Sequence, residues 1–278
     1  MEFSNVIPAF TLTLIAGLCT GVGSALAFFA RRTNTRFLCV SLGFSAGVML
    51  YVSLIEIFAK ARDSLSEVLG PRGGYWATTG AFFSGMLFIA IIDRLVPSYE
   101  NPHESHGVEE LADKQPERNM PAEASVHDPR LLRMGLMSAL AIGIHNFPEG
   151  LATFTAALKD PSLGLAIAVA IAIHNIPEGI AVSVPVYYAT GSRRRAFFYS
   201  FLSGISEPLG ALLGYLVLIR FFSDTTFGIL FAAVGGIMVY ISLDELLPTA
   251  EKYGEHHLSI YGLVSGMAVM ALSLLLFV

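Results

Sequence analysis

Long apolar runs separated by short polar breaks limit the fold of this sequence more than any other feature. A helix that crosses a membrane needs about 20 consecutive, mostly apolar residues. The 278-residue chain contains eight such runs, and only 14% of its residues are charged, against about a quarter in soluble domains. The runs are, approximately, 7–30, 37–59, 75–96, 131–157, 162–188, 196–220, 226–248 and 259–278. The sequence therefore predicts an all-α polytopic membrane protein with eight transmembrane helices.

The chain as a whole is expected to form a single transmembrane domain, 1–278, with one polar insertion. Residues 98–130 are rich in Pro, Glu, Asp and His, a composition typical of a flexible linker. This segment is predicted to be a flexible cytoplasmic loop between the third and fourth helices. Its histidines, His103, His106 and His127, either bind a metal loosely or are simply solvated, and the sequence leaves both open.

Composition and local sequence also argue against nucleic-acid binding, a secretory signal and a cysteine-based site. The net charge of −5, without a basic patch interleaved with aromatic residues, predicts no nucleic-acid binding. The N-terminus lacks the positive region of a secretory signal, so we expect the first apolar run to remain as a membrane helix. Cys19 and Cys39 are not spaced as metal or disulfide pairs and are expected to be packing residues.

Two nearly identical hexapeptides lie inside apolar runs, HNFPEG at 145–150 and HNIPEG at 174–179. Within each, His and Glu are four residues apart and so share one face of a helix. Ionisable groups inside membrane helices are costly and are usually functional. The prolines remove a backbone donor, which frees one carbonyl oxygen in each helix to face a cavity or a neighbouring helix.

These donors suit a divalent cation. Imidazole and carboxylate bind zinc, cobalt, nickel, iron(II) and manganese, and the Asn amide adds an oxygen. Glu207, in the run 196–220, supplies a third intramembrane carboxylate and is also followed by proline. A structural His–Glu hydrogen bond is the alternative, but two copies of the motif and a third carboxylate favour a metal site. The candidate metal ligands are His145, Asn146, Glu149, His174, Asn175, Glu178 and Glu207.

Three further carboxylates and a methionine are candidates for a path to this site. Glu56 is expected near the outer mouth, and Asp244 and Glu245 near the inner mouth, as entry and exit positions. They are equally compatible with interfacial carboxylates at helix ends. Met49 is a possible soft ligand, although most membrane methionines are packing residues.

The sequence repeats itself around the two hexapeptides. Residues 47–58 match 236–247 at six of twelve positions, and Ser-Gly-Met recurs at 84–86 and 265–267. The first three helices thus resemble the last three, and because equivalent helices are five places apart in the chain, an odd number, the two units must run in opposite directions. This 3+2+3 inverted repeat is typical of secondary transporters, whose substrate site lies at the repeat interface.

Basic residues indicate the orientation of the predicted helices. Twelve lie in the loops of one side and five in the loops of the other. Because the side richer in Lys and Arg is usually cytoplasmic, both termini are expected outside the cytoplasm.

The two hexapeptides, the SEPLG of residues 206–210 and the His-containing loop together resemble the ZIP (Zrt-/Irt-like protein) metal transporter family, and most closely its bacterial zinc-transporting branch. The resemblance covers nearly the whole chain. It implies metal uptake across the bacterial inner (cell) membrane through a two-metal centre, and often a homodimer. By this resemblance His145, Glu149, His174 and Glu178 hold one ion. Asn146, Glu149, Asn175, Glu178 and Glu207 hold the second.

The favoured hypothesis is a secondary transporter rather than an enzyme. Zinc, and also iron, manganese, cobalt or cadmium, would be transported substrates and not cofactors. A passive metal-selective channel is the main alternative. An intramembrane metalloprotease is disfavoured, because His-x-x-x-Glu with an intervening proline differs from the helical His-Glu-x-x-His motif and leaves no general base.

Overall fold

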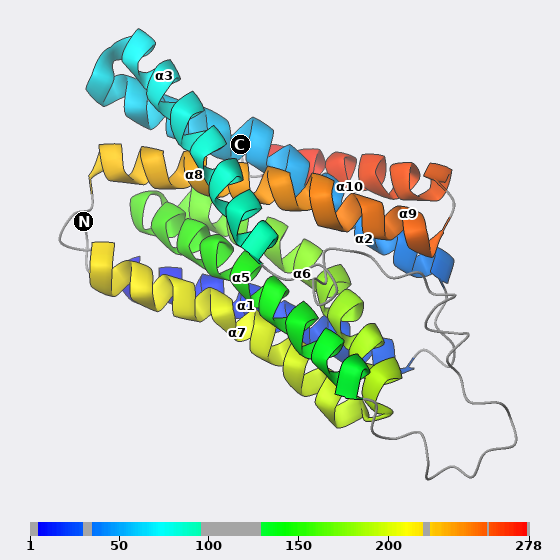
Figure 1. The fold of residues 1–278 in the computed structure, drawn as a ribbon. Coiled ribbons are helices and arrows are strands. Elements are labelled where there is room, and N and C mark those ends of the chain that lie inside the picture. The colour runs from blue at the N-terminus through cyan, green and yellow to red at the C-terminus, as the bar shows by residue number, and fades with distance from the viewer. Residues whose placement is uncertain (1–4, 30–34, 96–128, 219–222, 255, 277–278) are drawn as a thin grey trace, which may run out of the picture.

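A computed structural model describes residues 5–29, 35–95, 129–218, 223–254 and 256–276, and within these ranges the chain is helical with short connections (Figure 1). The all-α prediction is confirmed for this part of the chain. The helices are α1 (Val6–Phe29), α2 (Thr35–Tyr51), α3 (Phe58–Leu95), α5 (Pro129–Lys159), α6 (Pro161–Thr190), α7 (Arg193–Leu218), α8 (Asp224–Ile241), α9 (Leu247–Tyr253) and α10 (His256–Leu276). Two π-helical segments, η2 (Val52–Ile57) and η3 (Ser242–Leu246), join α2 to α3 and α8 to α9.

Six segments of the described chain are long and apolar enough to cross a membrane. One of them, Arg36–Arg94, has 59 residues. A straight helix of that length would be about 90 Å long, three times the hydrocarbon thickness. Large apolar side chains such as Phe83, Phe88 and Leu272 are more than half exposed, which suits a surface that faces lipid.

The long segment turns back at Gly70, which divides α3 into two arms (Figure 1). Gly70 has φ 75° and ψ 164°, a conformation that side chains with a Cβ rarely adopt. Pro71 follows, and proline suits the first turn of a helix because its missing N–H has no helical partner there. The runs 37–59 and 75–96 predicted that the second membrane helix ends near residue 59 and is followed by a polar break. Instead the helix continues to Gly70, because 60–69 is polar but contains no helix breaker.

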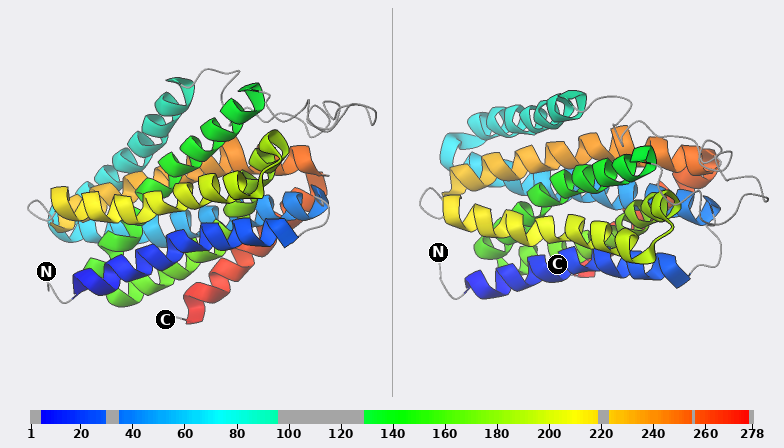
Figure 2. Two further views of the ribbon diagram at one scale, coloured as in Figure 1. Left: turned by 90° about the horizontal axis from the view of Figure 1, so that it is seen from below. Right: turned by 60° about the horizontal axis from the view of Figure 1, so that its bottom comes forward.

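The helices form two groups that lie side by side (Figures 1 and 2). In one group α1 packs along α6 and α7, and α5 packs along α7 and α6. In the other α3 packs along α8, and α10 along α2. Lys159 at the end of α5 links the groups: its Nζ donates to Ser64 Oγ at 2.7 Å and lies 3.0 Å from Asp224 Oδ1.

Helices of the second group pack closely at glycines that contact the backbone of a neighbouring helix. A Cβ at Gly47 of α2 would lie 2.0 Å from the carbonyl oxygen of Leu263 on α10. A Cβ at Gly236 of α8 would lie 1.9 Å from that of Phe82 on α3. Only glycine permits such approaches between membrane helices.

The two π-helical segments occur in the matching stretches 47–58 and 236–247. The N–H of Phe58 donates to Ser53 O, and the N–H of Leu247 donates to Ser242 O, both five residues back. Single π turns inside α-helices are often found at functional sites. Sequence periodicity gave no indication of either segment.

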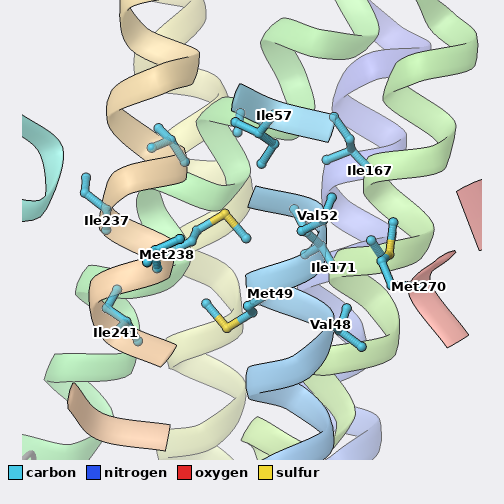
Figure 3. Close-up of a cluster of buried hydrophobic side chains, with 14 of the residues drawn as sticks. Val48, Met49, Val52, Ile57, Ile167, Ile171, Ile237, Met238, Ile241 and Met270 are labelled. Atoms are coloured by element: carbon cyan, nitrogen blue, oxygen red, sulfur yellow. The ribbon is translucent and has the colours of Figure 1, made fainter. Parts of the chain in front are cut away.

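Apolar side chains fill the space between the helices around α2 and α8 (Figure 3). Met49 and Met238 project between these two helices and are 0% and 1% exposed. Val48 projects from the opposite side of α2 and Ile237 from the opposite side of α8, and both belong to the same apolar cluster (Figure 3). In this conformation Met49 is a packing residue, which matches the alternative that the sequence left open for it.

Candidate metal centre

Six of the seven candidate ligands are described in full, and all six are buried. Helix α5 supplies Asn146 and Glu149, α6 supplies His174, Asn175 and Glu178, and α7 supplies Glu207. None of these side chains is more than 3% exposed. The side chain of His145 lies outside the described part of the structure, as do the loop histidines His103, His106 and His127.

Glu149, His174 and Glu178 form a compact cluster. Each offers a ligand atom, and these atoms lie within 4.8 Å of one another. His174 Nε2 is 3.2 Å from Glu149 Oε2. Two ligands of one tetrahedral zinc ion, each about 2.05 Å from the metal, are about 3.3 Å apart. The spacing between these two atoms therefore fits ligands of a shared ion.

The hydrogen bonds of His174 favour metal binding through Nε2. Its Nδ1 lies 3.1 Å from the carbonyl oxygen of Ala170, so the proton on Nδ1 is donated to the backbone. In the neutral ring Nε2 then presents a lone pair to the Glu149 carboxylate. Two acceptors at this distance need a proton or a cation between them. Metal-binding histidines commonly have such a second hydrogen bond, which fixes the tautomer.

The two asparagines are oriented by backbone carbonyls of the flanking helices. Asn146 Nδ2 donates to Ser203 O at 3.2 Å, and Asn175 Nδ2 donates to Ala16 O at 2.8 Å. Asn175 Nδ2 also donates to Glu207 Oε1. Because each amide nitrogen is held by a neighbour, each amide oxygen is directed away from it and remains available as a ligand.

Five buried oxygens of these residues have no hydrogen-bond partner, and all five are acceptors. They are Asn146 Oδ1, Glu149 Oε1, Asn175 Oδ1, Glu178 Oε2 and Glu207 Oε2. Leaving one buried polar group unsatisfied costs about 1–3 kcal/mol, and more if it is charged. A set made only of acceptors is satisfied by a cation, and not by another acceptor.

The charges of the cluster lead to the same conclusion. Three carboxylates are buried on adjacent helices, and within the described chain no Lys or Arg forms an ion pair with them. Buried negative charges are unstable unless a positive group neutralises them. A divalent cation, or two, is the partner that this donor set fits best.

The proposed path residues differ in their surroundings. Glu245, on η3, is 8% exposed and lies close enough to Glu178 for the two carboxylates to repel each other. Asp244 is exposed and accepts a hydrogen bond from Tyr240. Glu56, on η2, is only partly buried, and its Oε1 lies 3.9 Å from Lys60 Nζ. Of these three, only Glu245 thus approaches the cluster.

Sequence reasoning missed the groups that position the ligands. The carbonyls of Ala16, Ala170 and Ser203 are backbone atoms, which no side-chain pattern can reveal. Ser45 is a similar case, since its Oγ donates to His174 O at 3.4 Å from a different helix. The one available signal was proline, which predicted free carbonyls near each hexapeptide but not their partners.

Comparison with known proteins identifies the family of this chain. The family model described as ZIP zinc transporter matches residues 5–274. A zinc transporter ZupT from Nitratidesulfovibrio vulgaris is 66% identical, with 100% of this chain and 99% of the relative covered. ZupT proteins from Clostridium perfringens and Streptococcus mutans are 61% and 58% identical, and the matches cover 98–100% of each chain. This chain therefore belongs to the ZIP family of zinc transporters.

Proposed function

We propose that this protein is a secondary transporter that carries zinc into the cytoplasm through a centre that binds two metal ions. The observation that carries the proposal is the set of five buried, unpartnered acceptor oxygens on α5, α6 and α7. Relatives named zinc transporters support zinc as the cargo. The His, Glu and Asn donors also suit iron(II), manganese, cobalt and cadmium, which we include as further substrates.

The two ions are assigned as follows. His145, Glu149, His174 and Glu178 hold the first. Asn146, Glu149, Asn175, Glu178 and Glu207 hold the second, with both glutamates bridging. The short separation of His174 and Glu149 supports the first assignment. The contact between Asn175 and Glu207 supports the second.

The protein is proposed to cross the membrane eight times in a 3+2+3 inverted repeat. The turn at Gly70 supports two crossings within Arg36–Arg94, and α5 adds one to the remaining spans. Contacts between the repeats support the symmetry. Gly47 packs on Leu263 and Gly236 on Phe82, while Gly85 packs on Ala233 and Gly266 on Phe44. Exchanging the two repeats converts the contact of Gly47 into that of Gly236, and the contact of Gly85 into that of Gly266.

The proposed orientation in the bacterial inner membrane places both termini outside the cytoplasm, as the distribution of basic residues predicts. Zinc would then pass Glu56 on entry and Glu245 on exit. The closeness of Glu245 to Glu178 supports the second of these steps. We also propose that the group α1, α5, α6 and α7, which carries all the ligands, moves as a block. A homodimer remains a proposal from the family resemblance.

Zinc uptake in a metal-starved bacterial host tests the function. Glu149→Ala and Glu178→Ala should each reduce uptake to background, because each removes a ligand shared by both ions. Glu67→Ala, an exposed glutamate on α3, is the control and should transport normally. Saturable uptake by both buried variants would contradict the proposal. Competition with iron(II), manganese, cobalt and cadmium measures the metal preference.

A passive metal-selective channel is the alternative that shares the same site. Zinc preloaded into vesicles should accelerate the entry of radioactive zinc through a carrier by exchange, whereas a channel shows no such acceleration. The donor set gives no support to an intramembrane protease, since every candidate carboxylate is assigned to cargo.

A further inference from the structure

Helices α1 and α7 cross at a pair of glycines beside the metal centre. A Cβ at Gly17 would lie 2.4 Å from Gly204 O, and a Cβ at Gly204 would lie 2.3 Å from Gly17 O. Under the proposed repeat these glycines are equivalent, so the crossing lies on the pseudo-symmetry axis. Positions at equal distance from the two glycines should therefore occupy equivalent places around the centre.

The asparagines of the two hexapeptides support this equivalence. Asn175 binds the carbonyl of Ala16, which precedes Gly17, and Asn146 binds that of Ser203, which precedes Gly204. Exchanging α1 with α7 and α5 with α6 converts the first hydrogen bond into the second.

Thr20 and Glu207 are the equivalent residues three positions after the glycines. A Cβ at Gly179 would lie 1.9 Å from Thr20 O, and a Cβ at Gly150 would lie 2.0 Å from Glu207 O. Their side chains also lie alike. The Cβ of Glu207 is 3.3 Å from the Cβ position of Gly17, and the Cβ of Thr20 is 2.9 Å from that of Gly204.

The equivalent positions 20 and 207 differ in their side chains. Glu207 reaches Asn175, the asparagine of the second motif. Thr20 is shorter, and its Oγ1 is fully buried without a hydrogen-bond partner. The asparagine of the first motif, Asn146, is also fully buried and has an unpartnered Oδ1. Each half thus contains an unpartnered amide oxygen, together with an unpartnered hydroxyl in the first half and an unpartnered carboxylate oxygen in the second.

We propose that Thr20 is a positioning residue for the metal cargo and is the uncharged counterpart of Glu207. This inference rests on the proposed metal centre. The Thr20 hydroxyl binds a water carried by the ion that Asn146 ligates, and so completes the half of the centre that lacks a third carboxylate. A water needs several polar partners in a buried site, and the ion, the hydroxyl and the amide provide them.

The uncharged residue limits how tightly the centre holds its cargo. A fourth carboxylate at this position would add a charge-assisted contact, which is about twice as strong as a neutral one. A transporter must release its ion, so a tighter centre would bind better and turn over more slowly. Threonine at position 20 therefore balances binding against release.

Zinc binding to the purified protein in detergent, measured by equilibrium dialysis, tests the inference together with uptake. Thr20→Glu should bind zinc about tenfold more tightly and transport it more slowly. Glu207→Thr should bind about tenfold more weakly. The double variant Thr20→Glu/Glu207→Thr moves the carboxylate to the other half and should restore most of the lost affinity. A double variant that binds no better than Glu207→Thr would overturn the equivalence.

Two conservative variants of Thr20 test the role of its hydroxyl even if the glutamate variants do not fold. Thr20→Ser keeps the hydroxyl and should bind zinc as the wild type does. Thr20→Val keeps the shape and removes the hydroxyl, so it should bind several times more weakly. Equal binding by these two variants would overturn the role of the hydroxyl. If the wild-type protein bound no zinc that Glu149→Ala abolishes, the proposed function itself would fail.

Discussion

The segments η2 and η3 lie in the matching stretches 47–58 and 236–247 and have the same irregular backbone, yet their glutamates have different surroundings. Glu56 on η2 is partly exposed and lies nearest to Lys60 on its own helix. Glu245 on η3 is buried and lies close to Glu178 of the metal centre. Related sequence therefore produces related backbone, but glutamates that are unequally buried.

This difference in burial bears on the proposed entry and exit roles of the two glutamates. An inverted repeat that alternates between two states exchanges the environments of its halves. Under the proposed transport cycle, the buried glutamate and the partly exposed one would exchange their environments. The two carboxylates should accordingly affect different steps of transport.

Gly47→Val and Gly236→Val test whether the two halves share the same close helix packing, and these variants should have the largest effect. Each added side chain would begin within 2.0 Å of a carbonyl oxygen, which no rotamer can avoid. Both variants should lose most of their folded protein, since overpacking typically costs about 1–3 kcal/mol even in milder cases. Size-exclusion chromatography in detergent measures the folded fraction.

Gly80→Val is the matched control, because a Cβ at Gly80 on α3 meets nothing within 4 Å. It should yield as much folded protein as the wild type. Should Gly236→Val fold normally while Gly47→Val does not, the two halves would not share a packing constraint.

Glu245→Gln and Glu56→Gln test whether the two glutamates act at different steps of transport. Each substitution removes the charge with little change in shape. Glu245→Gln should lower the maximal rate of zinc uptake about tenfold, because the proposed exit path loses a buried carboxylate, equivalent to about 1.4 kcal/mol. Glu56→Gln should raise KM about threefold and leave the maximal rate nearly unchanged, since it weakens capture at the entrance.

Zinc uptake measured over a range of external concentrations separates these two effects. A lower maximal rate in Glu56→Gln with a normal Glu245→Gln would reverse the assignment of entry and exit. Equal changes in both variants would remove the functional distinction between the segments.

Much of the fold follows from hydropathy, because lipid requires long apolar helices whose backbone bonds are satisfied internally. The runs near 131–157 and 162–188 agree closely with α5 and α6. The π segments and the extension of α3 to Gly70 were not predictable in the same way. They depend on polar helix ends and on contacts with other helices, which single-segment patterns do not contain.

The candidate site could also be predicted only in part, because some of its features depend on contacts between helices. Repetition of the hexapeptide predicted its ligands, and the structure brings Glu149, His174 and Glu178 together. Thr20 has no distinguishing motif, and only its equivalence to Glu207 at the crossing of α1 and α7 singles it out. The approach of Glu245 to Glu178 likewise depends on how two helix groups pack, which sequence alone leaves open.

The smallest expected effect concerns Lys60, the neighbour that distinguishes Glu56 from Glu245. The two groups are 3.9 Å apart and the lysine is about half exposed, a geometry typically worth about 0–1 kcal/mol. Lys60→Met should therefore leave both KM and the maximal rate within about twofold of the wild type. If this variant raised KM as much as Glu56→Gln does, the ion pair rather than the free carboxylate would be the entrance element. Repeating the uptake at high salt, which screens exposed pairs, distinguishes the two explanations.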